Sequence, residues 1–155
     1  MKNFLELTDT NHTLNNTITV RPYFDKSAPS VIVQHDDFVL YTGTLPEVRS
    51  FTFNCKLKDL YSVKVSLSYK DEDSEPESAV IVEQFIVDDI PLLPKYMLHS
   101  VYDASDDPTT HLDKIGTWSM KFKQPFYQWY HNVSGQGWLF YQNQSSLMLH
   151  LYILL

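Results

Sequence analysis

The sequence is poor in cysteine, in basic residues and in long apolar runs, and each shortage excludes a class of protein. The single cysteine, Cys55, allows no internal disulfide, so we expect the chain to fold in a reducing cytoplasm. The 12 Lys and Arg residues stand singly among 19 Asp and Glu residues, which argues against nucleic-acid binding. No apolar run approaches the ~20 residues that span a bilayer, and no secretion signal opens the chain, so we expect no membrane insertion.

The motifs of common catalytic classes are also missing. There is no Gly-x-Ser-x-Gly elbow, and the six histidines are scattered without the spacing of a metal site. Cys55 shares the apolar face of an alternating run, where we expect it to be buried and unreactive. We predict that the chain is not an enzyme. A hydrolase is the alternative, but with 19 acidic residues the presence of a carboxylate pair decides nothing.

Alternation of apolar and polar residues is the strongest pattern that is present. It runs without error through 51–57 and 61–69, and it returns in 117–123. The short connection Lys58–Leu60 predicts that the first two runs form an antiparallel hairpin. The nearly continuous apolar run 80–87 predicts a central strand that is covered on both faces.

Weaker patterns complete an all-β chain of about nine or ten strands. His35-Asp36-Asp37 predicts a tight turn between two of them, and any helix should be limited to a turn or two near 91–98 or 126–131. We therefore predict a single domain over residues 1–155, folded as a two-sheet antiparallel β-sandwich or jelly roll. The acidic segment 71–78 should be a mobile surface loop. The weaker strands are expected at 4–7, 18–24, 31–34, 38–41, 138–141 and 147–153.

The acidic loops suggest a calcium site, because calcium prefers several oxygen ligands and sandwich loops can provide them. None of these loops has the sequence of an EF-hand. The alternative to a calcium site is that these carboxylates are simply solvated, and we predict no obligatory cofactor. The candidate calcium ligands are Asp88, Asp89, Asp103 and Asp106.

Two segments suggest contact with a partner. Segment 125–130 places four aromatic rings in six residues, and these can fill a sandwich edge, form a protein interface or stack on sugars. The terminal strand 147–155 is apolar on both faces, so it needs cover from its own domain or from a neighbouring subunit. The candidate partner-binding residues are Phe126, Tyr127, Trp129, Tyr130, Trp138, Leu151 and Ile153.

Six segments carry a further pattern: 38–45, 51–57, 61–69, 80–90 (which ends in Val87-Asp88-Asp89-Ile90), 116–122 and 125–129. Together they resemble small β-sandwich virion proteins of tailed phages, especially cyanophages, which are themselves similar to carbohydrate-binding modules. The resemblance covers about residues 30–130, although Asp89 stands where the family pattern usually has glycine. The strand from Leu147 matches no part of the pattern.

The resemblance implies a non-catalytic virion protein, either a capsid decoration or a tail or baseplate component, which is assembled in the host cytoplasm. Its partners would be other virion proteins in a symmetric assembly, where multivalency strengthens modest contacts. The alternative that it implies is a calcium-assisted carbohydrate-binding module that recognises a glycan on the host surface.

Overall fold

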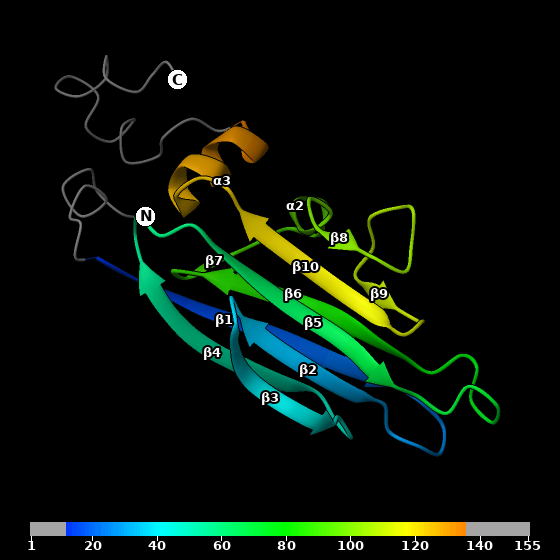
Figure 1. The fold of residues 1–155 in the computed structure, drawn as a ribbon. Helices are drawn as coiled ribbons and strands as arrows, with labels where there is room; N and C mark the ends of the chain where they lie inside the picture. The colour runs from blue at the N-terminus through cyan, green and yellow to red at the C-terminus, as the bar shows by residue number, and fades with distance from the viewer. Residues whose placement is uncertain (1–11, 136–155) are drawn as a thin grey trace, which may run out of the picture. The chain divides into compact units, whose positions relative to one another are not determined.

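The computed structural model describes residues 12–135, which form ten strands and two short helices (Figure 1). No helix in this part of the chain has the length and apolar character that a membrane crossing requires. The helices are α2 (Pro94–Met97) and α3 (Phe126–Ser134). The strands are β1 (Thr13–Tyr23), β2 (Ser30–His35), β3 (Phe38–Thr44), β4 (Arg49–Lys56), β5 (Tyr61–Tyr69), β6 (Ala79–Val87), β7 (Ile90–Pro91), β8 (Val101–Tyr102), β9 (His111–Leu112) and β10 (Gly116–Phe122).

The chain divides into two compact units. The sandwich unit consists of Asn15–Phe53 and Tyr61–Lys121. The second unit consists, in the described part of the chain, of residues 12–14, 54–60 and 122–135.

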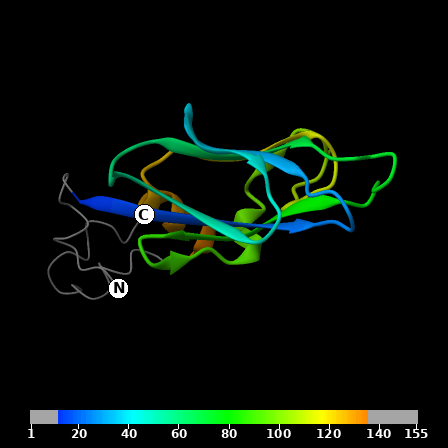
Figure 2. The same cartoon turned by 90° about the horizontal axis from the view of Figure 1, so that it is seen from below.

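Two antiparallel sheets make up the sandwich. One has the strand order β4-β1-β6-β7, with β9 also paired to β6, and the other has the order β3-β2-β5-β10-β8. Figure 2 shows the two sheets as separate layers. The predicted all-β class and the two-sheet sandwich are therefore confirmed.

The alternation in the sequence becomes the alternation between core and surface. In β5 every odd position from Tyr61 to Leu67 is buried, and the residues between them are partly exposed. Trp118 and Met120 of β10 are buried in the same way. Because successive side chains of a strand point to opposite faces, the strands with this pattern each contribute one apolar face to the core between the sheets.

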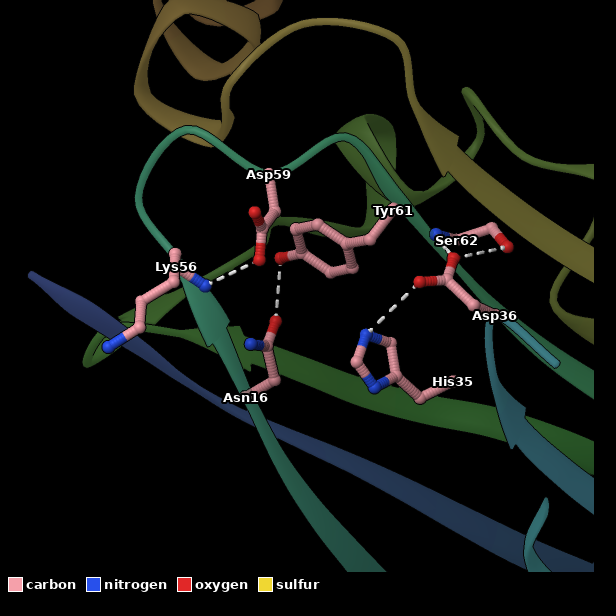
Figure 3. Close-up of polar contacts among 7 residues, drawn as sticks. All are labelled: Asn16, His35, Asp36, Lys56, Asp59, Tyr61 and Ser62. Atoms are coloured by element: carbon pink, nitrogen blue, oxygen red, sulfur yellow. Dashed lines mark hydrogen bonds and ion pairs between the residues drawn. The ribbon is translucent and has the colours of Figure 1, made fainter. Parts of the chain in front are cut away.

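The predicted hairpin between the runs 51–57 and 61–69 is wrong. Both runs are strands, but β4 pairs with β1 in one sheet, whereas β5 pairs with β2 and β10 in the other. The connecting turn is closed by its own bonds: the Lys56 N–H donates to Asp59 Oδ2 at 2.7 Å, and the Asp59 N–H donates to the Lys56 carbonyl at 3.0 Å (Figure 3). Alternation shows that a strand has one buried face, but it does not identify the neighbouring strand.

The predicted tight turn is confirmed. Strands β2 and β3 pair up to His35 and Phe38, so the turn consists of Asp36 and Asp37. Asp36 adopts a positive φ of 51°. Its carboxylate accepts the Ser62 N–H at 2.8 Å, and its own N–H donates to the Ser62 carbonyl at 2.9 Å, so the turn is attached to β5 (Figure 3).

The other local predictions have mixed outcomes. Helices occur at both expected places, and Cys55 is a buried free thiol, as predicted. The run 80–87 lies in β6, which is central in its sheet, although Glu83 and Gln84 are exposed on its outer face. The predicted strands 4–7, 138–141 and 147–153 lie outside the described residues.

Candidate binding pocket

The predicted aromatic contact segment forms helix α3 and packs against Phe122 within the second unit. Phe126 is fully buried and Trp129 is 9% exposed. Their rings meet the Phe122 ring edge to face, with centroid separations of 5.7 and 4.8 Å. Tyr127 and Tyr130 are half-buried. Most of this aromatic surface therefore stabilises the unit itself, and a docking role for the segment stays a prediction.

The remaining predicted contact residues cannot be placed. Trp138, Leu151 and Ile153 lie outside the described residues.

The four aspartates proposed as calcium ligands come from two separate loops. Asp88 and Asp89 form the two-residue turn between β6 and β7, and both have positive φ, at 50° and 68°. Asp103 and Asp106 lie in the loop between β8 and β9, where Asp103 Oδ1 accepts the Thr117 N–H at 2.8 Å. Within residues 12–135 no three His, Cys, Asp or Glu side chains gather as a metal site would require. A calcium role for these aspartates stays a prediction.

A pocket of about 450 Å³ lies in the sandwich unit, where the β1–β2 and β5–β6 loops meet. The strand register places these loops at one end of the sheets, because Tyr23 pairs with Ala79 and Ser30 pairs with Tyr69 (Figure 1). This volume is in the range of small-molecule sites. The pocket is lined by Tyr23, Phe24, Asp25, Ser74, Glu75, Pro76, Glu77 and Ser78.

Glu75 joins the two loops. Its carboxylate accepts the backbone N–H groups of Asp25 at 2.9 Å and Lys26 at 2.8 Å, and also that of Ser27. The side chain is only 5% exposed. Burial acts to raise the pKa of Glu75, but the three backbone hydrogen bonds outweigh it and hold the pKa below the ordinary glutamate value. A charged carboxylate therefore fixes the β1–β2 loop against the β5–β6 loop.

Lys70 anchors the acidic segment 71–78 from its start. Its Nζ donates to the carbonyls of Pro76 at 2.7 Å, Ser78 at 2.9 Å and Asp113 at 2.6 Å. The side chain is 5% exposed, so its charge is directed to backbone oxygens in the protein interior. Three charge-assisted hydrogen bonds give this segment a defined conformation.

Two exposed side chains of the pocket can contact a ligand, and a third side chain carries a buried hydroxyl without a partner among the described residues. The Tyr23 ring is 61% exposed, and Glu77 is exposed. Ser78 is only 2% exposed, and its Oγ has no hydrogen-bond partner in the described part of the chain. Buried hydroxyls are normally paired, so the Ser78 Oγ indicates a place for a further polar group. The pocket thus offers an aromatic face beside hydrogen-bonding oxygens.

The acidic loop of this pocket is evident in the sequence, but the role of Tyr23 is not. A usable signal existed in β1, where the even positions Ile18 and Val20 are buried and the odd positions face outward. Tyr23 is an aromatic residue at an outward position. Nothing local in the sequence shows that it meets a loop some 50 residues away, because that contact depends on the sheet register.

Comparisons with known proteins give a distant similarity of fold. No family model matches the sequence, and no curated protein shows significant sequence similarity. Among solved structures, the chain is similar to the carbohydrate-binding module vCBM60 in complex with galactobiose, with a TM-score of 0.48 and 14% identity over 69% of this chain and 97% of that one. The chain is also similar to a selenomethionine form of vCBM60, from work on two families of calcium-dependent carbohydrate-binding modules. That similarity has a TM-score of 0.46 and 15% identity, and it covers 70% of this chain and 90% of the other. Neither similarity identifies a ligand for this chain.

Proposed function

We propose that this chain is a non-catalytic glycan-binding module whose site is the pocket between the β1–β2 and β5–β6 loops. The observation that carries the proposal is the exposed Tyr23 ring in a pocket of about 450 Å³ whose other lining groups include carboxylates and hydroxyls. A sugar has an apolar face that packs on an aromatic ring, and its rim of hydroxyls pairs with such oxygens.

The lining residues would have different roles in binding. Tyr23 would stack on one face of the sugar ring, while Glu77 and Ser78 would take hydrogen bonds from its hydroxyls. Glu75 would act as a positioning residue, because its carboxylate is already occupied by three backbone N–H groups. Since the two loops are joined before the ligand arrives, little ordering would be needed on binding.

A glycan array, followed by calorimetry on the glycans that bind, tests this proposal. Tyr23→Ala should weaken binding at least tenfold, about 1.4 kcal/mol, because the stacking surface is removed. Tyr69→Ala is the matched control, since Tyr69 is 58% exposed but does not line the pocket. Tyr69→Ala should leave the affinity unchanged. Absence of binding to every glycan, or equal affinity of the Tyr23→Ala variant, would contradict the proposal.

The virion role predicted from the sequence resemblance has no support from the comparisons or from the described residues. It stays a prediction, and it is compatible with glycan binding, since a virion protein can carry a glycan site. The location of the protein is likewise untested.

A further inference from the structure

The pocket has an unbalanced charge. Asp25, Glu75 and Glu77 line it, and no Lys or Arg is among its lining residues. Lys70 directs its Nζ to three backbone carbonyls. Lys26, although exposed in the β1–β2 loop, is not one of the lining residues. Among the described residues, no cationic side chain therefore lines the pocket, and the ammonium group of Lys70, which directly precedes the acidic segment, is already occupied.

Two of the three carboxylates are free to meet a ligand. The carboxylate oxygens of Glu75 already accept hydrogen bonds from backbone N–H groups of the β1–β2 loop. Asp25 and Glu77 are both exposed, and the described residues provide neither carboxylate with an ion pair. A ligand that enters beside Tyr23 thus meets two negatively charged side chains and an aromatic ring.

A second, independent feature shows that this is more than a cluster of acidic side chains. Ser78 lines the same pocket, is 2% exposed, and its Oγ lacks a hydrogen-bond partner among the described groups. A hydroxyl so deeply buried is normally satisfied, so a polar ligand atom is the expected complement.

We infer that the pocket prefers a sugar that carries a protonated amine, such as a hexosamine, over neutral sugars. This inference rests on the proposed glycan-binding function and specifies its substrate class. An ammonium group donates charge-assisted hydrogen bonds to carboxylates such as Asp25 and Glu77, and these are roughly twice as strong as neutral ones. The exposed Tyr23 ring adds a favourable cation–π contribution.

Three β-1,4-linked glucan oligomers of equal length provide a matched set of ligands. Their backbones are identical, and only the substituent at C2 differs: an amine in glucosamine oligomers, an acetamide in the N-acetylated oligomers and a hydroxyl in cello-oligomers. Galactosamine, N-acetylgalactosamine and galactose repeat the comparison for the other common ring configuration. Calorimetry at about pH 5.5, where the sugar amine is protonated, should give at least tenfold tighter binding for the amine member of one series.

Charge-neutralising variants test the assignment to this pocket. Asp25→Asn with Glu77→Gln should reduce the amine preference to about twofold, because both ion pairs are lost while the shape is kept. Glu47→Gln is the control, since Glu47 is exposed in the β3–β4 loop and does not line the pocket. It should preserve the full preference. Thermal unfolding of each variant verifies that the fold is intact.

The outcomes separate the two proposals. If a neutral sugar binds in a Tyr23-dependent manner as tightly as its amine analogue, the inference is overturned and the glycan-binding function stands. If no sugar of either kind binds in these series or on the array, both are overturned. If a lysine-rich peptide binds through Asp25 and Glu77 while no sugar does, the pocket recognises basic protein segments, and both glycan proposals are again overturned.

Discussion

At the scale of single residues, Asp89 occupies a backbone position where glycine is the usual residue. Asp88 and Asp89 form the β6–β7 turn with φ of 50° and 68°, the left-handed pair that is typical of a type I′ hairpin turn. Asp tolerates this region better than most residues, but glycine enters it without steric cost. Asp89→Gly should therefore raise the free energy of unfolding by about 0.5–1 kcal/mol, measured by urea denaturation.

Asp37 provides the control for this substitution. It belongs to the other Asp-Asp turn, where only Asp36 has a positive φ. Asp37→Gly should lower the free energy of unfolding by about 0.5 kcal/mol, because glycine only adds freedom to the unfolded chain there. Equal effects of the two glycine substitutions would show that the backbone conformation is not the cause.

Glu75 predicts a dependence of stability on pH. Its pKa in the folded protein is lower than the ordinary value, so its stabilising contribution is complete above the ordinary pKa of 4.5 and is lost as the pH falls through the folded value. Glu75→Gln should be less stable than the wild type near neutral pH, and this difference should narrow as the solution becomes more acidic than pH 4.5. Urea unfolding across this pH range checks the prediction.

Glu77→Gln is the control, because Glu77 lies in the same loop. It should leave the free energy of unfolding nearly unchanged, and an equal effect of both variants would contradict the role of Glu75.

At the scale of elements, Lys70 determines the conformation of the segment between β5 and β6. Lys70→Met should leave the carbonyls of Pro76, Ser78 and Asp113 without their donor, at a cost of about 3 kcal/mol in the free energy of unfolding. The 71–78 segment should also become more sensitive to a protease that cleaves after glutamate, at Glu72 or Glu77. Lys121→Met is the control, because Lys121 is exposed. Unchanged proteolysis in the Lys70 variant would contradict the anchoring role.

The strands could be predicted from the sequence because their side chains report burial directly. The run 61–69 has the same bounds as β5, and its apolar side chains from Tyr61 to Leu67 face the core, whereas Tyr69 at the end of the strand is exposed. The sheet to which each strand belongs could not be predicted in the same way. Strands β4 and β5 have the same alternation, yet they lie in different sheets, because strand pairing depends on contacts with β1 and β2 that are distant in the sequence.

Only the acidic segment of the candidate site could be predicted from the sequence, and the reason is related. The acidic segment 71–78 is recognisable from composition alone, but its composition suggests a freely solvated loop. The buried Lys70 and Glu75 give it a defined conformation, and both act on backbone groups, which every residue carries. Hydrogen bonds to backbone atoms leave no signature in the partner's residue type, so the pocket emerges only when the fold is known.

At the scale of the whole molecule, the predicted single domain can be tested through its tryptophans. Strands β1, β4 and β10 each have residues in both compact units, so the backbone continuity of three strands favours one cooperative unfolding transition. Trp118 reports on the sandwich unit and Trp129 on the second unit. Two double variants, Trp129→Phe with Trp138→Phe and Trp118→Phe with Trp138→Phe, leave one reporter each. In both variants we expect the urea midpoint from fluorescence to coincide with that from far-ultraviolet circular dichroism. Both probes are applied to the same variant, so a general loss of stability would shift the two midpoints equally. A fluorescence midpoint that differs from the circular dichroism midpoint in the variant that retains Trp129 would show that the two units unfold independently.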